Sequence, residues 1–283
     1  MDIKRKNTAE HLRFDMTKKV PLLTCDALSE YGALRHGFST RSGGVSKGIF
    51  ESLNFKRGIG DSDADVNENF RRIADAFGIT ADRIVVTQQT HTSNVRVVTE
   101  EDAGKGVTLP LDYTDTDGLV TDVPQLLLSV FSADCVPVIF YDPLRKCIGA
   151  CHSGWRGTVG RISKNVLKAM TSYYGSSPSD VICAIGPSIC KDCYEVSTDV
   201  ADEFKKEFPG HADEILLDKH NGHFQLDLWK SIQITLEEAG VRFSHIHTTD
   251  ICTCENPDLL FSHRASHGRR GVQGAFIMLT GGN

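Results

Sequence analysis

Short apolar runs bounded by turn-forming residues recur along the chain. The clearest lie close together, at residues 126–131, 136–141 and 147–151. Runs of this length are typical of buried β-strands. The same character predicts further strands at residues 84–86, 95–98, 119–121, 181–185 and 275–279, and an alternating pattern predicts one more at 244–249.

Other segments repeat their apolar residues every three or four positions, as one face of a helix does. Residues 61–77 show this spacing, and Gly78 follows as a C-terminal cap would. The same spacing predicts helices at 159–174, 198–208 and 226–239. Because strand and helix patterns alternate, the sequence favours an α/β fold. The polar first twenty residues fit either a loose tail or an edge strand.

Composition narrows the function classes. A chain of 283 residues with 40% hydrophobic residues can bury a substantial core. A net charge of −6 without a long basic run argues against a protein that binds nucleic acid. The N-terminus is charged where a signal peptide would be apolar, no apolar run approaches a membrane span, and the nine cysteines are an odd number. We therefore expect a cytoplasmic protein with reduced thiols and no membrane partner.

Candidate chemistry gathers where the predicted strands give way to loops. Cys135 lies between two apolar runs, His152 follows a third, and His91 lies in the polar loop after residues 84–87. Two imidazoles and one thiol suit zinc, and three protein ligands leave a fourth position for water or substrate, as in catalytic zinc sites. From residue types alone, a small core cysteine and two hydrogen-bonded loop histidines are the simpler interpretation.

Residues 36–46 mix hydroxyls, Arg41 and a Gly-Gly pair. Glycines let a backbone approach a ligand closely, and an arginine among hydroxyls suits phosphate or ribose. From these residues alone, a polar surface loop is the simpler interpretation.

A helix that starts directly after Gly157 would direct its N-terminal amides toward the His152 loop, which suits an anion such as phosphate. Arg156 and Arg161 would add positive charge there. Alternatively, Arg156 pairs with Asp134 and holds the two loops together.

Cys190 and Cys193 form a C-x-x-C pair. The pair fits a redox dithiol, or half of a structural zinc site that Cys252 and Cys254 would complete. No helix is predicted to start at Cys190, and the spacing of Cys252 and Cys254 is tighter than usual for such a site. We therefore expect unpaired, mostly buried thiols.

Two further polar groups look like ligands by eye. His220 and His223 flank Asn-Gly, the strongest short hairpin signal, and we interpret them as exposed turn residues. Asp115 and Asp117 precede a glycine, as turn formers often do.

Eight motifs follow one another along the chain: HGFSTRSGGVS, SLNF, QQTHTSNV, DGLVT, SADCVPV, HSGWRGT, IGPSICKDCYEV and CENPDLLFSHR. In this order they resemble the laccase-domain family, also called the polyphenol oxidoreductase family, to whose members purine nucleoside phosphorylase activity is attributed. The likeness runs from about residue 35 to about residue 279.

The resemblance implies a fold and a site. It implies a single domain of layered mixed β-sheets with flanking helices, at residues 31–283, after an N-terminal extension at residues 1–30, with a metal site at strand ends. The implied zinc ligands and catalytic residues are His91, Cys135 and His152. Substrate contacts are expected from Ser39, Arg41, Arg156 and Arg264. Where the family often has Thr-Gly-Arg before its last strand, this chain has Arg270-Gly271-Val272, so no contact is assigned there.

Three functions from different classes follow. The first is zinc-dependent phosphorolysis of purine nucleosides (adenosine, inosine or methylthioadenosine) by phosphate, with adenosine deamination in the same pocket. The second is copper-dependent oxidation of phenols, which ranks lower because oxidases that reduce dioxygen usually need several clustered metal ions. The third is a hydrolase, with Cys135 as nucleophile and His152 as base or acting on cell-wall precursors.

Overall fold

The computed structural model describes residues 3–8, 10–17 and 20–281, and its centre is a pair of six-stranded β-sheets. The first sheet has the order β1 (Leu12–Asp15), β2 (Leu22–Cys25), β3 (Leu34–Ser39), β15 (Gln273–Leu279), β7 (Leu127–Ser132) and β4 (Ile84–Val86). The second has the order β14 (Ile246–Thr248), β10 (Ile182–Ile185), β8 (Val136–Asp142), β9 (Cys147–Ser153), β6 (Gly118–Thr121) and β5 (Val95–Val97). Both sheets mix parallel and antiparallel pairs.

The two sheets bury a common core between their facing sides. Successive side chains of strand β15 point to opposite faces of the first sheet, so the strand contributes to the core on both faces. Ala275, Ile277 and Leu279 pack into the core between the sheets, whereas Phe276 and Met278 point to the opposite side. All seven residues of β15 are buried, which explains why the predicted strand is a continuous apolar run.

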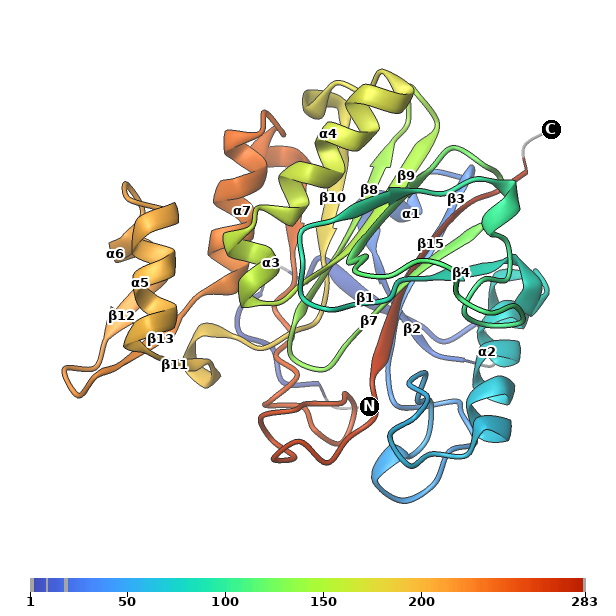
Figure 1. The fold of residues 1–283 in the computed structure, drawn as a ribbon, viewed down its shortest axis with the longest axis horizontal. Helices are drawn as coiled ribbons and strands as arrows, with labels where there is room; N and C mark the ends of the chain where they lie inside the picture. The colour runs from blue at the N-terminus through green and yellow to red at the C-terminus, as the bar shows by residue number, and fades with distance from the viewer. Residues whose placement is uncertain (1–2, 9, 18–19, 282–283) are drawn as a thin grey trace.

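Helices cover the outer faces of both sheets (Figure 1). Helix α2 (Asp63–Phe77) packs on the first sheet, and α4 (Ile162–Tyr174) and α7 (Leu228–Glu238) pack on the second. A small sheet of β11 (Glu195–Ser197), β13 (His223–Leu226) and β12 (Leu216–Asp218) lies with α5 (Thr198–Glu207) and α6 (Ala212–Ile215) at the left of Figure 1. The expected α/β fold of layered mixed sheets is confirmed. No helix within the described ranges is long and apolar enough to cross a membrane.

The N-terminal segment contributes to the first sheet. Strand β1 forms its edge and pairs with β2 in antiparallel register, and the short helix α1 (Asp26–Ser29) follows. The edge-strand alternative for the first twenty residues therefore holds for Leu12–Asp15. Residues 36–39 also belong to a strand, β3, so the interpretation of residues 36–46 as a loop is wrong for the first four of them.

The helix predicted at residues 159–174 is interrupted. A short helix, α3 (Trp155–Val159), precedes it, and α4 begins only at Ile162 because Arg161 adopts a left-handed conformation with φ of 55°. The Arg161 guanidinium turns to Glu207 and Glu238, at 2.8 Å from each carboxylate. Arg161 is therefore committed to pairing with α5 and α7, and the expectation that it adds charge to an anion site at His152 is wrong.

Candidate metal site and cavity

The structure brings His91, Cys135 and His152 together. Cys135 lies in the turn between β7 and β8, and the pairing of Val136 with Ser153 places that turn beside the end of β9, which carries His152. One nitrogen of each histidine and the Cys135 sulfur all lie within 4.8 Å of one another. The Cys135 Sγ is 3.9 Å from His91 Nε2, and the two imidazole rings meet edge to face at 5.0 Å.

Gln89 anchors the loop that carries His91. Its side-chain carbonyl accepts a hydrogen bond from the Phe131 amide at 2.8 Å, and its side-chain amide donates to the Phe131 carbonyl at 2.6 Å. His91 itself adopts a left-handed backbone with φ of 64°, which is uncommon for a residue with a side chain. The loop is thus fixed to β7, the strand that leads to Cys135.

Asp117 organises two of the three candidate ligands. Its buried carboxylate accepts a hydrogen bond from His152 Nδ1 at 2.8 Å, which leaves His152 Nε2 for a metal. It also accepts from the backbone amides of Thr90, His91 and Thr92, at 3.1, 3.2 and 2.8 Å. The interpretation of Asp117 as a turn former missed this role, which depends on the pairing of β6 with β9.

The site favours a charged pair of Cys135 and His152. Burial by itself would raise the pKa of Cys135, but the positive charge and hydrogen bonds of the two histidines more than offset it and lower this pKa to about 6. Burial would likewise lower the pKa of His152, but Cys135 and Asp117 raise it to about 9. A thiolate is the form that binds a metal, so the electrostatics of the site prepare Cys135 as a ligand.

Asp134 fixes the turn that presents Cys135. Its carboxylate accepts from the Thr253 hydroxyl and from the Arg264 backbone amide, both at 2.6 Å, and its carbonyl accepts from the Ile189 amide at 2.9 Å. The alternative in which Arg156 pairs with Asp134 is not what the structure shows. Arg156 is exposed, and its guanidinium lies over the Trp155 ring at 4.2 Å.

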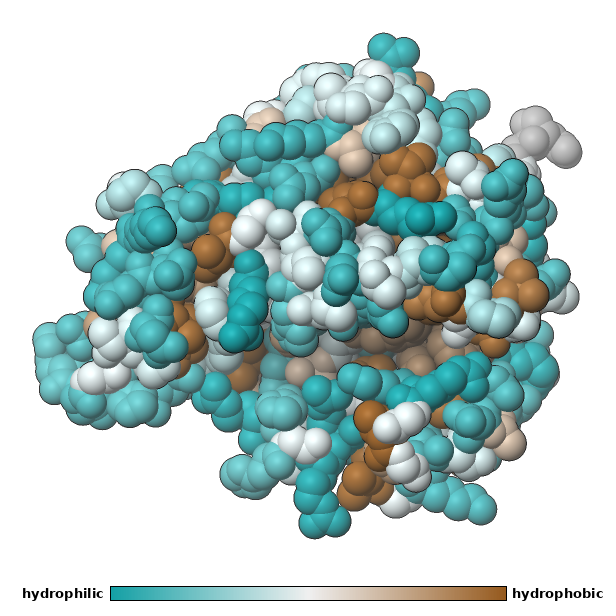
Figure 2. All heavy atoms as spheres, in the orientation of Figure 1, coloured by the Kyte–Doolittle hydropathy of each residue, from teal (hydrophilic) through white to brown (hydrophobic). Residues whose placement is uncertain are grey.

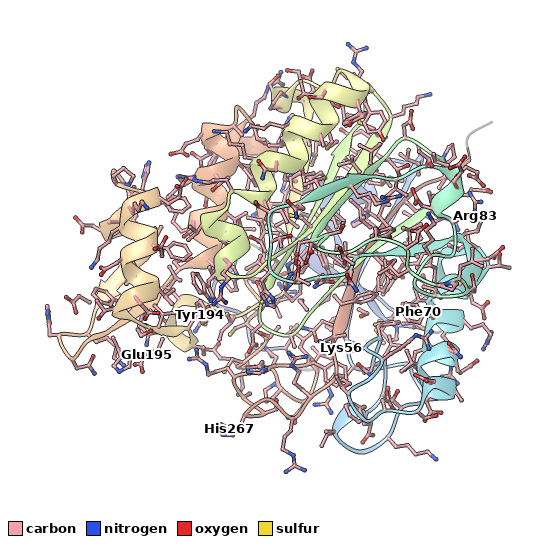
Figure 3. The ribbon with its side chains drawn as sticks, in the orientation of Figure 1. Lys56, Phe70, Arg83, Tyr194, Glu195 and His267 are labelled. Carbon is pink, nitrogen blue, oxygen red and sulfur yellow. The ribbon has the colours of Figure 1, made fainter. Side chains whose placement is uncertain are left out.

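A cavity of about 470 Å³ opens next to the candidate metal ligands. This size is in the usual range for small-molecule sites. Figure 2 shows a hollow across the middle of this face with apolar atoms on its floor. Phe55, Phe70 and Phe131 supply an aromatic wall, with the Phe55 and Phe131 rings stacked at 5.6 Å. Figure 3 labels two lining residues, Lys56 from the loop before α2 and Phe70 from α2.

Three cations line the same cavity: Lys56, Arg57 and Arg270. The Arg270 Nε is buried and has no hydrogen-bond partner among the described residues. Asn54 joins the segments that carry Lys56 and Arg270, because its side-chain carbonyl accepts from the backbone amides of Lys56 and Val272, each at 3.0 Å. Burial lowers the pKa of Lys56, and the neighbouring Arg270 charge lowers it further. Such a cluster is suited to an anion.

The residues expected to contact substrate lie elsewhere. None of Ser39, Arg41, Arg156 and Arg264 is among the residues that line this cavity. The Ser39 hydroxyl is buried and accepts from the Gly274 amide, and the Arg41 guanidinium donates to the Glu51 and Pro257 carbonyls. The Arg264 guanidinium donates to the carbonyls of Cys193 and Glu195. Arg270, to which the sequence assigned no contact, lines the cavity instead.

Gly154 allows the candidate ligands to approach each other. A Cβ at this position would lie 2.8 Å from the His91 ring and 3.0 Å from the Cys135 sulfur. We expect Gly154→Ala to weaken metal binding roughly 10- to 100-fold, the effect typical of displaced ligands. Competition with a chromogenic chelator measures this affinity. Gly210→Ala is the control, because its Cβ would meet no atom within 4 Å. Equal affinity in both variants would show that Gly154 places no constraint on the site.

A family model described as multi-copper polyphenol oxidoreductase laccase matches residues 35–280. The chain belongs to this family. The resemblance inferred from the eight motifs is thus confirmed. The Bacillus subtilis protein named purine nucleoside phosphorylase YlmD is 38% identical over 242 residues, which cover 85% of this chain and 87% of that one. The YlmD protein of Geobacillus stearothermophilus, also named a purine nucleoside phosphorylase, is 36% identical over 256 residues, 90% and 93% of the two chains.

Solved structures of this laccase family share the fold. The crystal structure of YlmD from Geobacillus stearothermophilus matches with a TM-score of 0.88 at 34% identity, covering 95% of this chain and 99% of that one. A hypothetical Bacillus licheniformis protein, YfiH, also gives 0.88, at 32% identity over 94% and 99%. Among the groups of metal-ligating residues found in the described ranges, only His91, Cys135 and His152 combine histidine with cysteine, and the other two are built around Cys190.

Proposed function

We propose that the protein is a zinc-dependent purine nucleoside phosphorylase that also deaminates adenosine. One observation carries the proposal: the His91, Cys135 and His152 group and the Lys56 and Arg270 cations line one cavity with an aromatic wall. A nucleoside needs the apolar wall for its base, and phosphate needs the cations. The names of the Bacillus and Geobacillus relatives point to the same reaction.

The donor set fits zinc. Zinc binds imidazole nitrogen and thiolate sulfur in tetrahedral sites, and catalytic sites keep three protein ligands and one open position. Here His91 comes from a loop, Cys135 from the turn between β7 and β8, and His152 from the end of β9, where the Asp117 carboxylate orients its ring. Zinc bound by them would act as a Lewis acid and would lower the pKa of a bound water.

The chain's own residues account for the binding and positioning steps. Phe55, Phe70 and Phe131 offer flat apolar surfaces for the purine. Lys56 and Arg270 would hold phosphate in line with the ribose, which lowers the entropic cost of bringing the two reactants together. In phosphorolysis a phosphate oxygen forms a bond to the anomeric carbon, the glycosidic carbon–nitrogen bond breaks, and the purine leaves with a proton. Deamination needs no such anion.

A cysteine hydrolase is the second candidate, and the charged pair of Cys135 and His152 favours it. A thiolate beside an imidazolium is also the arrangement of a cysteine nucleophile and its base. The copper oxidase ranks lower, because several clustered copper ions would need more histidines than the two that this group contains.

Product analysis tests the proposal. Adenosine should yield adenine and ribose 1-phosphate only when phosphate is present, whereas conversion to inosine should proceed without it. Removal of metal by a chelator should abolish both reactions, and added zinc should restore them. Chromatography of the products with and without phosphate gives the answer. No phosphate-dependent product, or a metal-free protein that stays active until a thiol reagent alkylates Cys135, would favour the hydrolase instead.

A further inference from the structure

Three cysteines outside the cavity form a second cluster. Cys190 and Cys193 lie in the turn after β10, and Cys252 lies after β14. The sulfur atoms of all three lie within 4.8 Å of one another, and all nine cysteines of the chain are free thiols. The proposed reaction uses none of the three.

Local structure explains how the three sulfurs meet. The C-x-x-C segment closes into a tight turn in which the Cys193 amide donates to the Cys190 carbonyl at 3.1 Å. Ser188 forms a parallel bridge with Cys252, which brings the second segment alongside. The Cys190 amide then donates to the Cys252 sulfur at 3.3 Å. This hydrogen bond holds the Cys252 sulfur against the C-x-x-C turn.

Glu255 offers a fourth ligand. Its Oε1 lies 3.8 Å from the Cys193 sulfur and 4.0 Å from the Cys190 sulfur. Lys6 approaches the same carboxylate at 2.5 Å and that of Asp192 at 2.9 Å. The positive charge of Lys6 thus offsets part of the negative charge of three cysteine thiolates and of the Asp192 and Glu255 carboxylates.

We propose that Cys190, Cys193, Cys252 and Glu255 bind a second zinc ion. In a tetrahedral zinc site with bonds of about 2.3 Å, neighbouring sulfurs lie roughly 3.8 Å apart, so these sulfurs need to move by no more than about 1 Å. Four protein ligands close the coordination sphere, as in structural rather than catalytic sites. The C-x-x-C spacing is the usual one for half of such a site. The alternative weighed from the sequence completed the site with Cys252 and Cys254, whereas this proposal uses Cys252 and Glu255.

A metal at the cysteine cluster would also stabilise the turn that carries Cys135. Ile189, directly before Cys190, donates its amide to the Asp134 carbonyl, and Thr253, directly after Cys252, donates its hydroxyl to the Asp134 carboxylate. Asp134 precedes Cys135 in the turn that presents the cavity ligand. The turn that holds Cys193 leads directly into Tyr194 and Glu195, which Figure 3 labels. A metal bound by Cys190 and Cys252 would therefore hold in position the two segments that donate hydrogen bonds to Asp134.

Metal content tests this site independently of the cavity site. Protein made with zinc in the medium, kept under reductant and dialysed against metal-free buffer, should hold two zinc ions per chain. Cys252→Ser and Cys193→Ser should each hold one, Cys135→Ala should hold one, and the double variant of Cys135→Ala with Cys252→Ser should hold none. Cobalt added to metal-free Cys135→Ala should give the strong thiolate charge-transfer absorption that the double variant lacks.

Cys183→Ala, which removes a buried core thiol outside the cluster, is the matched control and should keep both ions. Circular dichroism shows whether each variant folds. If Cys252→Ser does not fold, Cys193→Ser tests the cluster in its place, because Cys193 is only half-buried. Failure of the proposed cavity site alone would leave one ion in both the wild type and Cys135→Ala. Full metal content in folded Cys193→Ser, no metal in Cys135→Ala, or a Cys190–Cys252 disulfide in the reduced wild type would overturn the proposal.

Discussion

Replacing Cys135 with alanine is expected to release the cavity metal and to lower turnover on the order of 1,000-fold. A Lewis-acid metal contributes several kcal/mol to the barrier, and each 1.4 kcal/mol corresponds to a factor of about ten in rate. His91 and His152 alone would leave two ligands, one of which lies on an exposed loop. A pair of imidazoles without the thiolate binds zinc far more weakly.

Elemental analysis of dialysed protein and the rate of adenosine phosphorolysis measure these two effects. Cys147→Ala is the matched control, because Cys147 is buried at the other end of the same strand, β9, where its sulfur lies 3.2 Å from the Ser176 hydroxyl. It should keep the metal and most of the activity. Undiminished zinc at the cavity, or undiminished turnover in folded Cys135→Ala, would remove Cys135 from the ligand set.

Replacing Arg270 with methionine is expected to lower kcat/KM for phosphate by about 100-fold. Hydrogen bonds to charged groups contribute about 1.5–3 kcal/mol each, and methionine keeps much of the side-chain volume while removing the charge. The buried Nε of Arg270 has no partner among the described residues, so it is available to a bound anion. Deamination should change less, because it requires no phosphate.

Two arginines serve as controls for this measurement. Arg269→Met changes the preceding residue, whose side chain is exposed, and should leave phosphorolysis nearly unchanged. Arg156→Ala should also have a small effect, because Arg156 is exposed and does not line the cavity. If Arg156→Ala depressed phosphorolysis more than Arg270→Met in folded proteins, phosphate would bind beside the loop after His152, as the sequence predicts, and not at the Lys56 and Arg270 cations.

The sequence predicted those features that depend on neighbours along the chain. Buried strands such as β7, β8 and β9 are continuous apolar runs, and α2 ends at a glycine with φ of 72° that caps it. The three candidate ligands were found because they stand where such runs end and because the motifs around them resemble a family. The break before α4 escaped prediction, since Arg161 has no local feature that demands a left-handed backbone.

The rest of the site depends on which distant segments meet. The side chain of Asp117 contacts His152 only because β6 pairs with β9, and no spacing along the chain encodes that pairing. Arg270 reaches the cavity because Asn54 joins two segments that lie 218 residues apart. The cysteine cluster likewise depends on the bridge between Ser188 and Cys252. Spacing rules find sites built within one segment and miss those assembled from several.

The position of β15 has a consequence for how the protein is made. This strand holds the centre of the first sheet, between β3 and β7, yet it is the last strand of the described chain. Until the ribosome has released it, β3 and β7 have no strand between them, and each offers an unpaired edge to other chains. Synthesis at about 5–20 residues per second leaves these edges open for many seconds after β3 emerges. The first sheet is therefore complete only after β15 has been made, and until then β3 and β7 are open to edge-to-edge pairing.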